Sequence, residues 1–251
     1  MSVHLTHVVA AVVFNDHGQF LLSSRPKGKV YAGFWEFAGG KVEEGETELA
    51  ALQRELQEEL AIQISGATPW LTKIYQYEHA HVYLRFYRVL PHQWQGQIVC
   101  QEQQQYSWQS TGQLNVEPML PANGPILRAL ALPWESVGSW QTGWLGQNGM
   151  RQVRLAHDDA ADVVLLNDDK QRDLPDETLQ LLPWSLNGLS QNGDADGWWW
   201  RPESAQQIEQ AMSLLQKQPL DMPMLVILDK ECCHHQASLQ QIGWHVAVCK
   251  A

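Results

Sequence analysis

Residues 40–62 read GKVEEGETELAALQRELQEELAI, and this segment carries the clearest structural pattern in the chain. Thr47 can accept a hydrogen bond from the first turn of a helix, and Glu48 in that turn interacts favourably with the helix dipole. Leucines then recur at the spacing of one helical face, namely Leu49, Leu52, Leu56 and Leu60. The segment therefore predicts an α-helix over residues 47–60.

Three glutamates share one side of this predicted helix. Glu55, Glu58 and Glu59 stand at positions i, i+3 and i+4, so their carboxylates lie beside the leucine stripe. Arg54 is the nearby basic residue, and Glu46, just before the helix, can reach the same region. Charge runs are usually solvated faces, but a divalent cation would relieve the repulsion and use the carboxylates as hard oxygen ligands. The spacing alone leaves both interpretations open.

Two glycines, Gly39 and Gly40, follow a predicted short strand at residues 35–38. Glycine lets the backbone approach a ligand closely, so a carbonyl or amide group here could contact a metal ion or a phosphate. Triphosphate hydrolysis needs a metal ion that neutralises phosphate charge and orients an attacking water. The glycines and the acidic helix together indicate this chemistry.

The residues that define the pattern in and around the helix are Gly40, Glu46, Arg54, Glu55, Leu56, Glu58 and Glu59. This spacing resembles the Nudix box. Ala61 departs from the family pattern, which has a helix-ending glycine at that position. The resemblance implies the Nudix fold, an α/β arrangement in which a mixed sheet is sandwiched between helices.

The same resemblance implies roles for the matching residues. Glu55, Glu58 and Glu59 match the glutamates that bind magnesium, and the carbonyl of Gly40 matches a further metal ligand. Arg54 matches the arginine that orients the first of these glutamates. We therefore expect Mg²⁺ as the cofactor, with Mn²⁺ as a second candidate.

Residues 35–47, which read WEFAGGKVEEGET, extend the likeness to MutT-type enzymes, which sanitise oxidised guanine triphosphates. Ala38 stands where that group has a proline. The likeness implies a set of substrate-binding residues, namely Arg25, Glu36, Phe37, Gly39 and Asn123. Asn123 matches an asparagine that recognises the oxidised purine, although a loop asparagine is by default a turn residue. Glu102 matches a loop glutamate that binds metal or activates water.

These matches predict a magnesium-dependent hydrolase that converts 8-oxo-dGTP to 8-oxo-dGMP and pyrophosphate. The loop at residues 26–31 contains Lys27 and Lys29 and lacks a histidine that some MutT-type enzymes use near the nucleotide. Another substrate, such as a pyrimidine triphosphate, is therefore an alternative. A non-catalytic nucleotide sensor is a second alternative, which the complete set of glutamates disfavours.

Apolar runs predict the remaining elements of this half of the chain. Residues 7–14 and 19–23 are expected to pair as a hairpin. Two longer strands are expected at residues 70–77 and 81–90, and a short helix at residues 125–132. We predict that the Nudix domain comprises residues 1–133, because Pro133 interrupts the pattern.

Residues 134–251 are expected to form a small α/β domain of unknown role. A helix is predicted at residues 202–216, between strands at 161–166, 224–228 and 244–249. Some MutT-type proteins carry a C-terminal domain that resembles thiamine phosphate synthase. Only 117 residues follow Trp134, however, and a barrel of eight strand–helix units takes roughly 200 or more. A truncated remnant or an interaction domain is the expectation.

Composition restricts the partners. The formal net charge of −11 argues against a nucleic-acid polymer as ligand, since such binding needs a basic surface. The four cysteines are expected to be free thiols in a reducing compartment. No signal peptide or membrane-spanning stretch is apparent, so we expect a cytoplasmic protein without membrane contact. The oligomeric state is left open.

Overall fold

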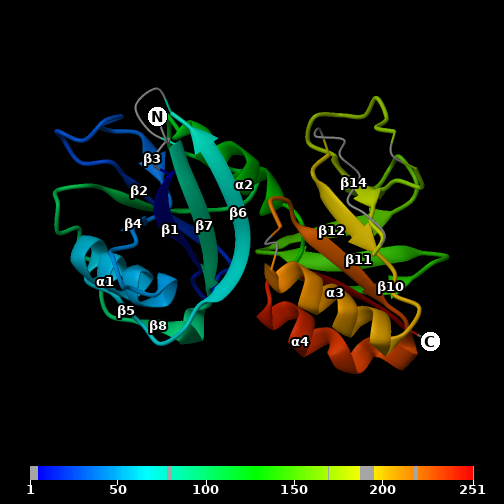
Figure 1. Ribbon diagram of the computed structural model, residues 1–251. Coiled ribbons are helices and arrows are strands. Elements are labelled where there is room, and N and C mark those ends of the chain that lie inside the picture. The colour runs from blue at the N-terminus through cyan, green and yellow to red at the C-terminus, as the bar shows by residue number, and fades with distance from the viewer. Residues whose placement is uncertain (1–4, 78–80, 169, 187–194, 218–219, 251) are drawn as a thin grey trace. The chain divides into compact units, whose positions relative to one another are not determined.

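The computed structural model describes residues 5–77, 81–168, 170–186, 195–217 and 220–250 (Figure 1). The chain divides into two compact units, Met1–Leu127 and Arg128–Ala251. The domain boundary after Pro133 stays a prediction.

A four-stranded mixed sheet with the order β4-β1-β7-β6 forms the centre of the first unit (Figure 1). Its strands are β1 (Leu5–Val13), β4 (Gly39–Lys41), β6 (Thr68–Gln76) and β7 (His81–Val89). β1 pairs in parallel with β7, whereas β4 and β6 are antiparallel to their neighbours. β7 alternates between buried and half-buried residues from His81 to Phe86, as expected for a strand whose two faces differ.

Two smaller sheets and two helices complete this unit. The order β3-β2-β9 describes one sheet, and β5-β8 the other. The bounds are β2 (Phe20–Ser24), β3 (Trp35–Glu36), β5 (Gln63–Ile64), β8 (Trp94–Gln95), β9 (Tyr106–Gln109), α1 (Glu48–Leu60), α2 (Gly124–Ala129) and the 3₁₀ turns η1 (Pro91–Gln93) and η2 (Pro121–Asn123).

Helix α1 packs its leucine stripe against one face of the central sheet. Leu52, Leu56 and Leu60 are fully buried there, in a cluster that includes Val9 and Val13 of β1. Burying each leucine stabilises the fold by about 1.5–3 kcal/mol. The helix is thereby fixed with its glutamates directed away from this core.

Several local predictions need correction. β1 and β2 lie in different sheets and meet only at an isolated bridge between Phe14 and Phe20, so the predicted hairpin is wrong. The predicted turn after Asn15 is present, but β2 pairs with β9 and not with β1. Gly39 and Gly40 belong to strand β4 and do not merely end a strand. Leu49 is 38% exposed and contributes no core contact.

The second unit is a closed barrel of eight strands in sequence order. They are β10 (Glu135–Ser139), β11 (Gly143–Asn148), β12 (Arg151–Ala156), β13 (Val163–Leu165), β14 (Leu179–Pro183), β15 (Gly197–Trp200), β16 (Met224–Leu228) and β17 (His245–Cys249). Only β11 pairs antiparallel with both neighbours, and all other pairs are parallel. Two helices follow late strands, α3 (Ala205–Lys217) and α4 (Gln236–Gln241), with a 3₁₀ segment η3 (Lys230–His235).

The expectation of a small α/β domain therefore needs correction, because the second unit closes into an eight-stranded barrel with few helices. Eight strand–helix units do not fit, but most connections in the described chain carry no helix. Residues 157–162 alone join β12 to the parallel strand β13. A connection between parallel strands has to run back along the length of the strand. Six residues suffice here because β13 is only three residues long.

The tryptophan-rich strand β15 illustrates how the barrel is filled. Trp199 packs with the cluster inside the barrel, which includes Trp144 and Leu165. Trp198 and Trp200 belong instead to the outer cluster under α3. Successive side chains of a strand point to opposite faces, so consecutive tryptophans serve both layers.

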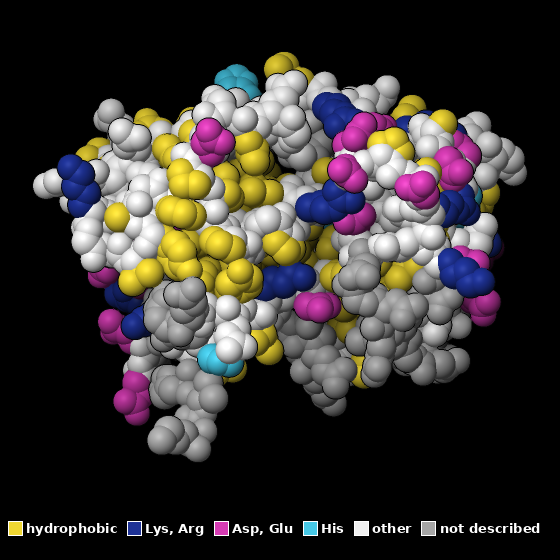
Figure 2. All heavy atoms as spheres, turned by 90° about the horizontal axis from the view of Figure 1, so that it is seen from above, with side chains coloured by type: hydrophobic (Ala, Val, Ile, Leu, Met, Phe, Trp, Pro, Cys, Tyr) yellow, Lys and Arg dark blue, Asp and Glu magenta, His cyan; other side chains and the backbone are white. Residues whose placement is uncertain are grey.

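Several charged side chains on the second unit form ion pairs with one another. Figure 2 shows basic and acidic groups side by side on this unit. Arg154 pairs with Asp158, and Arg151 pairs with Asp162. Within the described residues, no helix is both long and apolar enough to cross a lipid bilayer.

Candidate active site

Helix α1 presents the predicted glutamates from a well-defined start and end. Thr47 is the N-cap, and its hydroxyl accepts a hydrogen bond from the amide of Ala50 (3.2 Å). Ala61 ends the helix in the left-handed conformation, with φ 58° and ψ 22°. Its amide donates to the carbonyls of Gln57 and Leu56. The alanine therefore keeps the helix-ending turn despite its Cβ.

Arg54 connects the acidic residues around the helix. Its guanidinium donates to both carboxylate oxygens of Glu46 (3.0 Å each), to Glu55 (2.9 Å) and to Glu58 (3.3 Å). It also donates to the backbone carbonyl of Lys41 (2.9 Å). The bonds to Glu46 and Glu55 raise the pKa of Arg54, and Arg54 in turn lowers the pKa of Glu46. This arginine balances the repulsion within the acidic helix.

The three glutamates take different positions. Glu55 is mostly buried, with 16% of its side chain exposed, whereas Glu58 is 60% exposed. Glu59 accepts a hydrogen bond from the amide of Gly39 (3.3 Å). Burial, followed by repulsion from Glu36, raises the pKa of Glu59 to about 7. Across the described part of the chain, no three acidic, histidine or cysteine side chains converge as a ready metal-binding group.

The glycines of β4 allow two close approaches. A Cβ on Gly39 would lie 2.1 Å from the carbonyl oxygen of Val9, on the paired strand β1. A Cβ on Gly40 would lie 2.2 Å from the carboxyl group of Glu55. The carboxylate of Glu55 thus rests against bare backbone. Carboxylate and carbonyl oxygens are the ligands that Mg²⁺ prefers, so the residues present suit such an ion.

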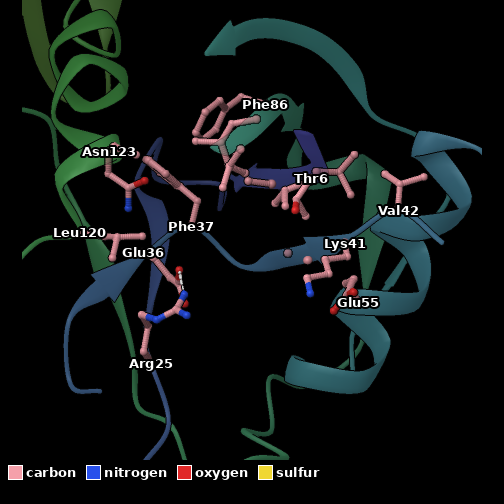
Figure 3. Close-up of a pocket in the computed structure, with 18 of the residues that line it drawn as sticks. Thr6, Arg25, Glu36, Phe37, Lys41, Val42, Glu55, Phe86, Leu120 and Asn123 are labelled. Atoms are coloured by element: carbon pink, nitrogen blue, oxygen red, sulfur yellow. Dashed lines mark hydrogen bonds and ion pairs between the residues drawn. The ribbon is translucent and has the colours of Figure 1, made fainter. Parts of the chain in front are cut away.

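A cavity of about 770 Å³ extends from this acidic region to an apolar end (Figure 3). Glu55, Lys41 and Val42 lie on one side of it, and Phe37 and Asn123 lie on the other. The face of the central sheet opposite α1 contributes further lining, from Val8, Ala10, Val82, Leu84 and Phe86. The volume is within the range of small-molecule sites.

The apolar end holds one buried amide among aromatic rings. Asn123 is 4% exposed, and its side-chain nitrogen donates to the carbonyl of Trp35 (3.4 Å). Phe37 makes an edge-on contact with Phe86, with ring centroids 5.9 Å apart. A planar ring with polar edges could pack on this surface, with Asn123 as a hydrogen-bonding group.

Arg25 and Glu36 form an ion pair at the wall of the cavity, drawn as a dashed line in Figure 3. The guanidinium lies 2.6 Å from the carboxylate, and its Nε donates to the carbonyl of Val30 (2.7 Å). Burial raises the pKa of Glu36, and Arg25 opposes part of that rise. The pair places one positive and one negative group beside any ligand.

The structure brings most, but not all, of the predicted site residues to the cavity. Arg54, Glu58 and Glu102 are not among the described lining residues. Glu102 lies on a loop, where its carboxylate is 2.6 Å from the ammonium of Lys29. The predicted group of metal-binding residues is therefore drawn together only in part.

Other lining residues were missed by sequence reasoning. Tyr31 and Tyr77 contact each other at the cavity, with ring centroids 5.9 Å apart, and no motif marks either residue. The alternation of β7 could have identified Val82, Leu84 and Phe86 as one face of a strand. The sequence marks Lys29 only as part of a loop that departs from the family pattern, because its partner Glu102 is 73 positions away in the chain.

A protein-family model described as the NUDIX domain matches residues 9–129. An 8-oxo-dGTP diphosphatase of Haemophilus influenzae is 33% identical over 130 residues, which cover 52% of this chain and 94% of that protein. A CTP pyrophosphohydrolase of Escherichia coli is 36% identical over 125 residues, covering 50% and 90%. A solved MutT structure from work on the Aliivibrio salmonicida and Vibrio cholerae proteins is 32% identical, covers 50% and 95%, and has a TM-score of 0.42.

The chain belongs to the Nudix family, whose members are hydrolases of phosphoanhydrides. Within that family it resembles the MutT-like proteins, being similar to both 8-oxo-dGTP diphosphatases and a CTP pyrophosphohydrolase. The family match ends at Ala129 and includes none of the barrel strands.

Proposed function

We propose that this protein is a magnesium-dependent pyrophosphohydrolase of nucleoside triphosphates, with 8-oxo-dGTP as its preferred substrate. The observation that carries the proposal is a single cavity that joins Glu55 and Glu59 to an apolar end with Asn123. A nucleoside triphosphate has the same division, since its triphosphate is charged and its base is a largely apolar ring. The products would be a nucleoside monophosphate and pyrophosphate, and the role would be sanitation of the nucleotide pool for DNA replication and repair.

The proposed metal ligands are Glu55, Glu58, Glu59 and the carbonyl oxygen of Gly40. A divalent cation held there, Mg²⁺ or alternatively Mn²⁺, would supply neutralisation of phosphate charge and a lowered pKa for a bound water. Arg54 orients Glu55 through the 2.9 Å hydrogen bond. Glu58 is exposed and would have to turn inward, which a solvated glutamate can do without losing a buried contact.

Substrate contacts are proposed for Arg25, Glu36, Phe37, Gly39 and Asn123. The amide nitrogen of Asn123 donates to Trp35, so its oxygen is available to accept a hydrogen bond from the base. Phe37 would pack against the ring. Glu102, once released from Lys29, is proposed to assist the attacking water by accepting its proton.

A pyrimidine triphosphate is the second candidate substrate. The similarity to a CTP pyrophosphohydrolase, at 36% identity, is the observation that favours it. A nucleotide sensor without activity is less well supported, because Glu55 and Glu59 both line the cavity and binding alone would not need two acidic groups beside a triphosphate.

Pyrophosphate release with magnesium at limiting substrate concentration would test the proposal, comparing 8-oxo-dGTP with dGTP, dCTP, CTP and dATP. A strong preference for 8-oxo-dGTP supports the base assignment, and preference for CTP or dCTP replaces it. Glu55→Gln and Glu59→Gln should each lower the rate by roughly two to three orders of magnitude. Glu209→Gln, on the exposed face of α3, is the matched control. Near-normal turnover in both cavity variants would overturn the catalytic assignment.

A further inference from the structure

Three basic side chains are among the described residues that line the cavity, namely Arg25, Lys29 and Lys41. Arg25 is held by its ion pair with Glu36 and its bond to the carbonyl of Val30. Lys29 is held differently, because its ion pair is with Glu102, and both of these side chains are more than 40% exposed. An exposed pair of this kind is worth little and exchanges partners at low cost.

The loop that carries Lys29 has a defined backbone. Residues 25–34 connect β2 to β3, and the amide of Arg25 donates to the carbonyl of Phe34 (2.8 Å). Gly33 adopts φ 82° and Tyr31 adopts φ 60°, both in the left-handed region. Tyr31 also packs against Tyr77. The backbone of Lys29 is thus positioned by its loop, while its long side chain can move.

The charges around Lys29 are acidic on both sides. Glu102 lies outside the cavity lining, and Glu59 and Glu36 lie within it. Burial alone would lower the pKa of Lys29, but the hydrogen bond to Glu102 and the fields of all three carboxylates raise it. The ammonium therefore stays charged at neutral pH, between an external carboxylate and the space next to Glu59.

We propose that Lys29 binds the polyphosphate of the nucleotide and that Glu102 occupies its place in the free protein. The proposal rests on the proposed function, since it assigns a further residue to the same site. A carboxylate and a phosphate oxygen are equivalent acceptors for an ammonium group, but a polyphosphate carries more charge. Binding would transfer Lys29 from Glu102 to phosphate and release Glu102 toward the cavity.

The test is a double-mutant cycle that needs neither catalysis nor metal. Inorganic tripolyphosphate is titrated by calorimetry into the full chain in EDTA at low ionic strength, where charge effects are least screened. The variants are Lys29→Met, Glu102→Gln and the double variant. Lys27→Met is the matched control, because Lys27 lies on the same loop and is not among the described cavity-lining residues.

Lys29→Met should weaken tripolyphosphate binding about tenfold, which corresponds to about 1.4 kcal/mol. Lys27→Met should bind as the parent does. Glu102→Gln should bind tripolyphosphate more tightly than the parent, because Glu102 no longer competes for Lys29. This gain should disappear in the Lys29→Met background, where there is no ammonium group to compete for. Equal binding by Lys29→Met and Lys27→Met, or an equal gain from Glu102→Gln in both backgrounds, would overturn the proposal.

Pyrophosphate release by the parent protein tests the proposed function separately from the role of Lys29. If the parent releases no pyrophosphate from any triphosphate while the cycle gives the expected coupling, the hydrolase proposal fails and the phosphate role of Lys29 stands. If the parent is active, Lys29→Met should raise the KM for a nucleoside triphosphate about tenfold. It should raise the inhibition constant of a nucleoside monophosphate by a smaller factor. A normal KM together with absent coupling removes the Lys29 assignment alone.

Discussion

At Gly40 a single missing side chain decides how the acidic helix meets the sheet. The carboxyl group of Glu55 occupies the space that a Cβ would fill, so helix and backbone come together there. Gly39 beside it permits close pairing of β4 with β1. Both close approaches depend on the absence of a methyl group at these two positions.

Gly40→Ala should therefore displace the Glu55 carboxylate and lower kcat/KM about 100-fold, the scale expected when a reacting group is shifted by about an ångström. Stability should change little, because the displaced atoms are the flexible end of a side chain. Gly66→Ala is the control, since its Cβ would meet only Gln93, at 3.7 Å. Steady-state kinetics and thermal unfolding measure both effects; unchanged kinetics for Gly40→Ala would exclude the close-approach role.

Ala61 ends helix α1 in a backbone conformation that is strained for any residue with a Cβ. It adopts the left-handed conformation with φ 58°, which costs an L-residue roughly 1–2 kcal/mol. Ala61→Gly should raise the free energy of unfolding by about 1 kcal/mol, the relief of strain being partly offset by the flexibility of glycine in the unfolded chain.

Denaturant unfolding followed by circular dichroism measures this gain. Ala50→Gly, in the first turn of the same helix, is the matched control and should lower stability by about 0.5–1 kcal/mol. If both substitutions destabilise equally, the left-handed strain at Ala61 is not significant.

At the scale of elements, α1 couples a buried stripe to a charged face. Leu52, Leu56 and Leu60 hold the helix on the sheet, while Arg54 connects the acidic groups of the opposite side. The helix thus positions Glu55 and Glu59 without using them in the core. Its cap at Thr47 was correctly predicted from the sequence.

Arg54→Met should lower kcat/KM by roughly ten- to a hundredfold, since hydrogen bonds between charged groups contribute about 1.5–3 kcal/mol. Glu55 would lose its orienting donor, and Glu46 would lose both of its bonds to the guanidinium. Arg54→Lys should restore little, because an ammonium group cannot form the forked contacts. Arg154→Met, which removes an exposed ion pair in the barrel, should leave the kinetics unchanged. Full activity of Arg54→Met would contradict the orienting role.

At the scale of the whole molecule, the cavity belongs to the first unit alone. Every described lining residue lies between Thr6 and Asn123, and the core under α1 is made from the same unit. The barrel has its own interior and its own outer cluster under α3. Each unit therefore has the packed core that independent folding requires.

We accordingly expect a chain of residues 1–133, our proposed Nudix domain, to fold and to retain the specific activity of the full chain. Pyrophosphate release, with circular dichroism to establish folding, is the measurement. The same fragment with Glu59→Gln serves as the inactive control. A folded but inactive fragment would show that the barrel contributes to catalysis.

Elements defined by near neighbours could be predicted from the sequence. Helix α1, strands β6, β7 and β16, and the acidic face follow from periodicity and capping over a few residues. Their patterns are local, so each is readable without knowing the fold. The glycines at positions 39 and 40 were also identified, although not as part of β4.

Only the tertiary structure decided the features that depend on distant residues. The partner of Lys29 is 73 positions away, and Asn123 reaches a carbonyl 88 positions earlier. Barrel closure joins β10 to β17 across nearly the whole second unit, through strands too short and too polar to read as buried β-structure. Such contacts form because packing brings remote segments together, and periodicity within a segment contains no record of which remote segment that will be.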